Sequence, residues 1–466
     1  MASPQATISN AAELKHAPQL PSKSILGHLQ MLLDDPLKKF SEARQEYGDI
    51  VGLRLGKNKA FLVFHPDMIQ QILLTNINNY SKQTRGYHKL RLFLGNGLVT
   101  SEGDFWRRQR RIAQPAFMRK RIEGFAETMS SFTERTVEQW RAVPEGETID
   151  VAKAMMTLTL GIAGQTLFSI DTSSDSDAIG PSLTYVLEYF PHLVSAPYPY
   201  PEWMPTLANL KFHRSKRQIY HVIDDIIAKR QQNKEERHND LLDMFMAVED
   251  EETGEKMNAQ QLRDECTTML LAGHETTANA ITWAFYALSK RPDIKQRLQH
   301  ELDTVLEGRS PTLEDLKQLP YLSNVFKETL RLYPPIWSLA RRAVEDDTVS
   351  GYHIPADSFI FLSQYVTHRH PDFWQDPETF DPERWTPERV EARKQISSSR
   401  FVYFPFSLGQ RKCIGDHFAH LEGEIILAIL LQHFDFEISD KVPVVLKPSI
   451  TLRPKDGIHI HLIPRS

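Results

Sequence analysis

One cysteine of this chain lies in a glycine-bounded loop that could present its sulfur to a metal. The segment from Phe406 to Gly415 reads FSLGQRKCIG and fits the pattern F-x-x-G-x-R-x-C-x-G. Gly409 and Gly415 permit a tight loop whose backbone N–H groups can point at the sulfur of Cys413. Such bonds tune how strongly a thiolate donates electrons to iron. A helical pattern over residues 416–434 follows directly, and a thiol placed before a helix N-terminus has a lowered pKa. The loop therefore predicts a thiolate ligand.

This loop resembles the cysteine loop of the cytochrome P-450 family, in which a thiolate holds the haem iron. Such a ligand pushes electron density that favours cleavage of the O–O bond. The resemblance covers nearly the whole chain, since the family's other motifs follow in the sequence. It implies haem b with Cys413 as axial ligand. It also implies the cytochrome P-450 fold, mainly α with small β-sheets, as a single haem domain over residues 25–466 after a loose N-terminal leader, residues 1–24.

An acid and an alcohol are neighbours inside a long helical pattern, residues 258–290. Residues 270–277 read LLAGHETT and fit the family's A-G-x-[DE]-T motif, which marks a helix across the distal face of the haem. The resemblance implies that Ala272 lets the backbone approach the porphyrin, that Thr276 holds bound O₂ and its waters, and that Glu275 relays protons. The alternative for the alcohol is a threonine that only bonds back to its own helix.

Two further motifs imply a structural charge triad. Glu328 and Arg331 form an E-x-x-R sequence, and residues three apart share a helix face. The segment from Phe380 to Trp385 matches the family's F-x-P-E-R-F motif except for its final tryptophan. The resemblance joins Glu328, Arg331 and Arg384 under the cysteine loop. Removing one partner of such a buried group would leave a charge uncompensated.

Several cations are expected to hold the haem propionates. Trp106 and Arg110 form a W-x-x-x-R pair on one helix face, and in the family this pair reaches a propionate, which suits the geometry of arginine. The resemblance gives the same role to Arg411 and to one of Arg341 and Arg342. We favour Arg341 because of its spacing from the upstream helix.

A group of six basic residues crowds the same region of the sequence. We hypothesise that they steer an acidic electron donor to the proximal face, while a solvated charged face is the alternative. Nothing after Ser466 supplies a flavin or iron–sulfur domain. We therefore expect electrons from NAD(P)H to arrive through separate proteins, a ferredoxin or flavodoxin with its reductase. The six residues are Arg107, Arg108, Arg111, Arg119, Lys120 and Arg121.

The substrate cavity is expected to be apolar. Its lining by the family pattern is Phe93, Ala272, Ile336, Leu339 and Ile450, and the segment 185–203 is expected to form a lid. An apolar pocket with few polar groups suits a hydrophobic substrate. Details of the motifs resemble bacterial family members that oxidise fatty acids, carotenoids or other terpenoids.

The composition is that of an ordinary globular protein. The chain has 466 residues and a formal net charge of −5, so no basic excess indicates a nucleic-acid partner. Two cysteines cannot form a disulfide scaffold. The N-terminus lacks the apolar segment of a secretory signal, and no run reaches the roughly 18 apolar residues of a membrane span. We therefore expect a cytoplasmic monomer without a transmembrane anchor.

The elements that must position these residues are mostly helical. Residues 49–64 alternate apolar and polar types on both sides of residues 56–59, which indicates a β-hairpin. Two more strand-rich patches cover residues 347–363 and 434–464. The pattern predicts a helical domain with small, scattered sheets.

Three functions are compatible with these motifs. The presence of both Glu275 and Thr276 favours an O₂-dependent monooxygenase. One alternative is a haem-thiolate peroxygenase or isomerase that uses peroxide, since such relatives often lack this pair. The other is a non-catalytic haem-binding sensor, which would bind haem without turnover.

Overall fold

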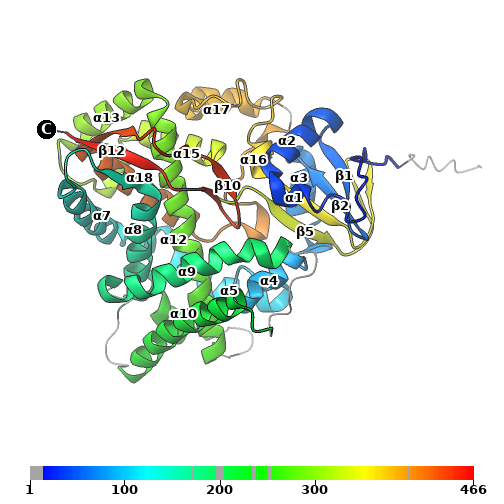
Figure 1. Ribbon diagram of the computed structural model, residues 1–466, viewed down its shortest axis with the longest axis horizontal. Coiled ribbons are helices and arrows are strands. Elements are labelled where there is room, and N and C mark those ends of the chain that lie inside the picture. Colours follow the sequence, from blue (N-terminus) through cyan, green and yellow to red (C-terminus); the bar gives the residue numbers. More distant parts are fainter. Residues whose placement is uncertain are drawn as a thin grey trace, which may run out of the picture.

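The longest helix, α12 (Ala259–Ser289), runs through the middle of the molecule (Figure 1). It begins with a capping box, in which Asn258 and Gln261 exchange side-chain and backbone bonds. This exchange satisfies N–H groups that the first turn of a helix leaves free. Most of its residues are buried, so α12 is a core helix rather than an amphipathic surface helix. Its bounds confirm the helix predicted over residues 258–290.

The computed structural model describes residues 14–465 except 170–171, 196–203, 234–237, 239, 250–253, 255 and 397. Helix α8 (Val151–Phe168) packs along α12. It is the one described helix long and apolar enough to cross a membrane, yet 67% of that segment is buried inside the protein. Burial of this kind is that of a core helix.

Helices gather around α12 at one end of the molecule, while α9 (Thr172–Ser195) and α10 (Leu207–Gln232) lie side by side below it (Figure 1). The helices that pack around the core are α7 (Ala126–Arg141), α13 (Pro292–Leu306), α15 (Pro320–Leu332) and α18 (Asp416–His433). The shorter helices are α1 (Met31–Asp34), α2 (Pro36–Tyr47), α3 (Pro66–Gln70), α4 (Arg85–Leu94), α5 (Gly103–Ala113), α6 (Arg119–Glu123), α11 (Leu241–Ala247), α14 (Leu313–Leu316), α16 (Gln364–Thr367) and α17 (Pro387–Lys394).

The main sheet lies at the opposite end (Figure 1). Its strand order is β1-β2-β8-β5-β3, and only the β2–β8 pair is parallel. The first two strands form the hairpin predicted over residues 49–64. The five strands of the main sheet are β1 (Ile50–Leu55), β2 (Asn58–Val63), β3 (Tyr80–Ser81), β5 (Leu339–Ala343) and β8 (Phe359–Leu362).

Three small sheets complete the strands and confirm the two C-terminal strand-rich patches. The first pairs β6 (Asp347–Val349) with β7 (Tyr352–Ile354), and the second pairs β10 (Leu446–Pro448) with β11 (Leu452–Pro454). The third has the order β4 (Thr148–Asp150), β12 (His459–Pro464) and β9 (Phe434–Ile438). The mainly helical architecture with small sheets is the one predicted.

Two segments differ from the expectation or fall partly outside the described residues. Residues 14–24, part of the expected loose leader, lie along the main sheet, where the Leu20 N–H bonds the Gly52 carbonyl at 3.0 Å and Ala17 is buried. The boundary of the haem domain at residue 25 stays a prediction. Of the expected lid, residues 185–195 belong to α9, and residues 196–203 lie outside the described part.

Candidate active site

The cysteine loop is held in a tight turn between η6 (Gly409–Arg411) and α18. Gly409 has φ +69°, and a Cβ there would lie 2.5 Å from the Leu73 carbonyl oxygen. Both observations require glycine at this position. The Cys413 N–H donates to the Phe406 carbonyl at 2.9 Å, and the Gly415 N–H bonds the sulfur and lowers the thiol pKa. The loop therefore presents a backbone donor to the sulfur, as its glycines predicted.

The prediction that the pKa of the Cys413 thiol is lowered is wrong for the polypeptide without a bound metal. Burial raises this pKa, and the Gly415 N–H and the Arg110 guanidinium only partly counter it. The cysteine residue is nevertheless exposed. Nearby protein atoms therefore desolvate the thiol, while the residue keeps exposed surface to which a ligand could bind. A metal bound there would remove the proton, since a coordinating thiol is deprotonated outright.

A second accessible surface lies in the middle of α12. Ala272 is exposed and Gly273 and Thr276 are half-buried, whereas His274 and Glu275 between them are buried. Residues at i, i+1 and i+4 share one side of a helix, so the accessible three form a stripe on a helix that is otherwise packed. The Thr276 hydroxyl donates to the Ala272 carbonyl at 2.9 Å, which is the back-bonding that the sequence left as an alternative. Its oxygen can still accept a bond from the stripe's side.

The acidic residue of the motif does not bond the neighbouring alcohol. One carboxyl oxygen of Glu275, Oε1, accepts a hydrogen bond of 2.7 Å from the Thr451 hydroxyl. Burial raises the pKa of Glu275, while this bond and the charge of Arg453 lower it. The adjacent His274 bonds the Leu270 carbonyl, and burial lowers its pKa to about 4. The histidine is therefore neutral at physiological pH.

Four basic side chains converge beside the cysteine loop: Lys82 and Arg341 are buried, and Arg110 and Arg411 are half-buried. Burial, Arg341 and Arg411 lower the pKa of Lys82 well below its usual value, and Arg110 adds to this effect. Glu102 is the carboxylate that acts on both Lys82 and Arg411. Because buried charges need compensation, this cluster suits an anionic ligand.

Each expected propionate residue has a defined place. The Arg411 guanidinium lies 3.6 Å from the Trp106 ring centroid and donates to the Ser101 carbonyl at 3.0 Å. Arg341 is 2% exposed, whereas the neighbouring Arg342 points outward to Asp357 at 2.8 Å. The alternation of β5 therefore turns Arg341 and not Arg342 into the cluster.

Arg110 has a different set of bonds from the expected one. Its Nη1 donates to the Lys412 carbonyl at 2.9 Å, directly before Cys413, and its Nε donates to Gln114 at 2.9 Å. The guanidinium thus braces the cysteine loop. Its contact with a propionate stays a prediction.

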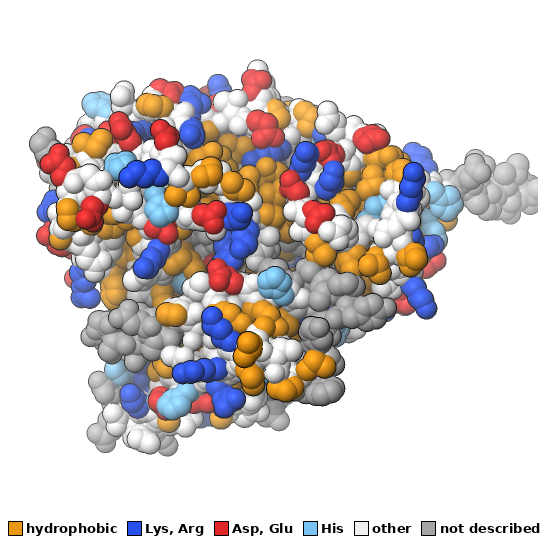
Figure 2. Space-filling model, in the orientation of Figure 1, with side chains coloured by type: hydrophobic (Ala, Val, Ile, Leu, Met, Phe, Trp, Pro, Cys, Tyr) orange, Lys and Arg blue, Asp and Glu red, His pale blue; other side chains and the backbone are white. Residues whose placement is uncertain are grey.

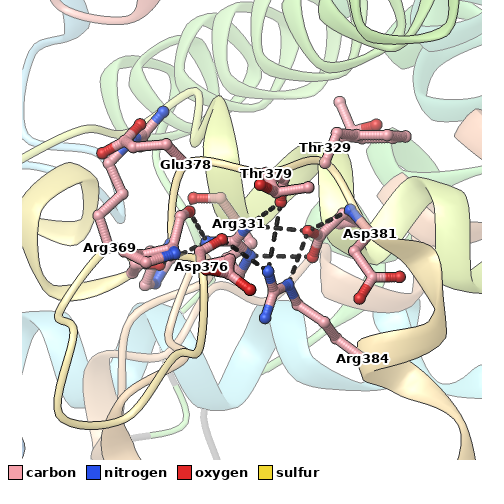
Figure 3. Close-up of polar contacts among 12 residues, drawn as sticks. Thr329, Arg331, Arg369, Asp376, Glu378, Thr379, Asp381 and Arg384 are labelled. Atoms are coloured by element: carbon pink, nitrogen blue, oxygen red, sulfur yellow. Dashed lines mark hydrogen bonds and ion pairs between the residues drawn. The ribbon is translucent and has the colours of Figure 1, made fainter. Parts of the chain in front are cut away.

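The charge triad comes together with one additional member. Glu328 is fully buried and accepts bonds from Arg331 at 2.8 and 2.9 Å and from Arg384 at 3.3 Å. The indole N–H of Trp385, the residue that departs from the family motif, donates to Oε2 of the same carboxylate at 3.0 Å. Figure 3 shows Arg331 and Arg384 converging, with Asp381 beside them. The tryptophan therefore adds a donor that phenylalanine would lack.

Four of the five expected pocket residues have accessible surface. Ala272 is exposed, and Ile336, Leu339 and Ile450 are half-buried. Phe93 is 2% exposed and packs in the main core. On the face drawn in Figure 2, hydrophobic side chains gather in the hollow between the helical end and the sheet.

Sequence reasoning missed Lys82, Thr451 and the bonding role of Trp385. Lys82 follows β3, whose pairing with β5 brings it beside Arg341. Thr451 approaches Glu275 only because the turn after β10 packs on α12. The tryptophan alone had a signal, its departure from the family motif.

These features fit haem b. The cysteine loop, with its backbone donor to the sulfur, suits the haem iron. The accessible stripe of small residues on α12 suits the flat ring, and the cluster of basic side chains suits the two carboxylates.

Comparison with known proteins agrees with this reading. The family model described as cytochrome P-450 matches residues 18–461. Cyclooctatin synthase of Streptomyces melanosporofaciens is 37% identical, covering 87% of this chain and 86% of its own. Pentalenene oxygenase of Streptomyces avermitilis is 31% identical over 92% and 91%, respectively. Protein LUTEIN DEFICIENT 5, chloroplastic, of Arabidopsis thaliana is 32% identical over 90% and 73%.

Proposed function

Because this chain belongs to the cytochrome P-450 family, we propose that it hydroxylates a terpenoid, with Cys413 as the axial ligand of the haem iron. As a member of that family it is a haem-thiolate monooxygenase of hydrophobic substrates, which uses haem, O₂ and electrons from NAD(P)H delivered by redox partners. The substrate class, the partner type and the role of each residue are the parts that we propose.

The names of three relatives support a terpenoid substrate. They are cyclooctatin synthase, cyclooctat-9-en-7-ol 5-monooxygenase and pentalenene oxygenase; two of them are named as oxygenases, and pentalenene is a terpene. The accessible residues of the expected pocket are all apolar: Ala272, Ile336, Leu339 and Ile450. A terpenoid hydrocarbon offers little to a charged group, whereas a fatty acid carries a carboxylate that such a pocket would leave unpaired.

Five cation-bearing or aromatic residues would hold the haem carboxylates. These are the expected Trp106, Arg110, Arg341 and Arg411, to which we add Lys82. Two propionates would balance the surplus positive charge of this cluster, and charge-assisted bonds of this kind are stronger than neutral ones. The triad of Glu328, Arg331 and Arg384 would fix the loop's surroundings without touching the haem.

When bound, haem supplies O₂ activation, which its thiolate ligand promotes. The protein's part is to bring protons to the reaction. The Thr276 hydroxyl faces the accessible stripe and would hold a proton donor, such as a water, by its oxygen. Glu275, whose pKa is raised by burial, would hold the proton that is passed on.

The electron donor is proposed to be a ferredoxin or flavodoxin. Arg107, Arg111, Arg119, Lys120 and Arg121 are exposed, and α6, which bears three of them, packs against the cysteine-side helix α18. A positive surface near the thiolate would raise the rate of encounter with an acidic donor.

Reversal of two of these charges tests the docking surface. Arg107→Glu combined with Lys120→Glu should slow reduction of the haem by about tenfold at low salt, and the difference should shrink as ionic strength rises. Lys229→Glu, on α10 and exposed, is the control. Equal reduction rates for the variant and the wild type in stopped-flow measurements would contradict the proposal.

One spectrum tests the thiolate and a screen tests the substrate. The reduced carbon monoxide complex of wild-type protein should show the long-wavelength Soret band of a thiolate ligand. Cys413→Ser should abolish this band, and Cys266→Ser, a buried cysteine outside the site, should keep it. A band that survives in Cys413→Ser would contradict the assignment of Cys413 as the axial ligand.

A substrate screen tests the terpenoid proposal. In a panel of cyclic terpenes, carotenoids and fatty acids, terpenes should shift the haem absorption spectrum and yield alcohols. Turnover of fatty acids alone would contradict the terpenoid proposal.

The remaining proposals concern the setting of the enzyme. We place it in the cytoplasm as a monomer, with residues 25–466 as its haem domain. Peroxide-driven catalysis without electrons is the main alternative, and a product that forms with peroxide but not with a reductase would favour it.

A further inference from the structure

A polar row on α12 fastens the turn between β10 and β11. Glu275, Asn279 and Trp283 lie four residues apart and so share one face of the helix. The Trp283 indole donates to the Leu452 carbonyl at 2.9 Å. The other two bond Thr451, whose hydroxyl donates to Glu275 Oε1 at 2.7 Å and accepts from Asn279 Nδ2 at 3.2 Å.

The side chains of Glu275, Asn279 and Thr451 are deeply buried, so their hydrogen bonds cannot be exchanged for bonds to bulk water. Glu275 is 3% exposed, Asn279 4% and Thr451 2%. An isolated hydroxyl or amide in such a place would cost free energy. The two hydrogen bonds of Thr451 give each of these side chains a partner. They also fix the direction in which the Thr451 hydroxyl donates its proton.

The direction follows from the number of protons that each group owns. An amide NH₂ group can only donate, and a hydroxyl has one proton and two acceptor lone pairs. Since Asn279 occupies an acceptor site of Thr451, the single hydroxyl proton belongs to the bond with Glu275. Oε1 is therefore an acceptor, and the acidic proton of a neutral Glu275 belongs to Oε2.

A charged path to the surface lies on the other side of the acid. Arg453 in β11 is the cation that acts on Glu275. Its Nη2 is buried without a hydrogen-bond partner among the described residues, 3.6 Å from Glu188 of α9. Glu188 has a half-exposed side chain, and that of Arg453 is 14% exposed. The acid thus sits between an internal hydroxyl and a guanidinium that connects to the surface.

We propose that Thr451 is a positioning residue for proton delivery, because its hydroxyl, oriented by Asn279, holds the Glu275 carboxyl with Oε1 as acceptor and Oε2 as the oxygen that bears the transferable proton. This inference rests on the proposed role of Glu275 as the proton relay. Thr451 lies beside Ile450, so the turn that contacts the expected pocket also sets the orientation of the acid.

Infrared spectroscopy of the ferric holoenzyme tests the inference without turnover. A carbonyl stretch falls in frequency when its oxygen accepts a hydrogen bond. The wild type should show a protonated carboxyl band that Glu275→Gln removes. Thr451→Val, which replaces the hydroxyl by a methyl group, should move that band to higher frequency. Thr451→Ser, which restores the hydroxyl, should return it. The titration midpoint of the band should rise in Thr451→Val, since the bond to Thr451 lowers the pKa of Glu275.

Two outcomes would overturn the inference: an unmoved band in Thr451→Val, or a wild type without a band that depends on Glu275. If Thr451→Val fails to retain haem, Thr451→Ala should show the same shift. Turnover is measured with the terpene that causes the largest shift of the haem absorption spectrum in the substrate screen. With this terpene, Thr451→Val should lower the product formed per NAD(P)H about fivefold, and Thr451→Ser should not. Normal coupling in Glu275→Gln would instead reject the proposed function of the acid, whatever the infrared result.

Discussion

Replacing Glu265 by glutamine should flatten the pH dependence of stability between pH 5 and 8.5. Glu265 lies on α12 with 2% exposure. Its Oε2 accepts the Leu98 N–H at 3.0 Å, and its Oε1 is buried without a partner among the described residues. Burial raises its pKa to about 8, a rise that the Leu98 N–H opposes and the charge of Asp264 supports.

The sign of the effect follows from linkage. The folded protein holds its proton up to about pH 8, whereas in the unfolded chain Glu265 ionises near 4.5. The stabilisation is therefore complete below pH 4.5 and is lost as the pH rises toward 8, because ionisation favours the unfolded state. At about 1.4 kcal/mol per pH unit, the wild type should lose about 3–5 kcal/mol over this range through this residue. Glutamine cannot ionise and should lose none of it.

The assay is urea unfolding of the holoenzyme at pH 5.0, 6.5 and 8.5, followed by circular dichroism and haem absorption. The stability of Glu265→Gln relative to wild type should increase with pH, whatever the constant offset that the substitution introduces. Asp315→Asn is the control, because its partner Arg309 lowers the pKa of Asp315, and its contribution is lost only as the pH falls below this range. A difference between Glu265→Gln and wild type that stays constant within about 1 kcal/mol would refute a buried neutral Glu265.

Three further perturbations test the site's supports. Trp385→Phe removes one of the donors to Glu328 and should lower the free energy of unfolding by about 1–2 kcal/mol; an unchanged urea midpoint would show that this bond adds nothing. Lys82→Met should speed haem transfer to apomyoglobin by at least about tenfold, because a buried charge-assisted bond is lost, and an unchanged transfer rate would remove Lys82 from the haem site. Gly409→Ala should reduce the haem content of purified protein, since its Cβ would lie 2.5 Å from the Leu73 carbonyl, and full occupancy would show that the loop can shift.

The sequence predicted those features whose physical cause is local. The alternation around residues 56–59 encodes the β1–β2 hairpin, because side chains in a strand alternate between faces. The apolar run and capping residues of α12 encode a long buried helix. The glycine before Cys413 encodes a left-handed turn, which any other residue would strain.

Predictions that depended on the surroundings fared differently. The helix after Cys413 indicated a lowered thiol pKa, yet burial by the rest of the protein outweighs that local effect and raises it. The doubled arginine left open whether Arg341, which we favoured, or Arg342 faces the site, and the pairing of β5 within the main sheet turns Arg341 inward and Arg342 toward solvent.

By itself, then, the sequence determined the chemistry that this protein can attempt: a thiolate loop, an acid beside an alcohol, and the elements that bear them. The tertiary structure alone decided which distant groups meet these residues. Lys82 joins Arg341 across a strand pair, and Thr451 reaches Glu275 because a C-terminal turn packs on α12. Contacts between residues 176 positions apart leave no mark in local spacing, since they depend on how the whole chain packs rather than on the preferences of either segment.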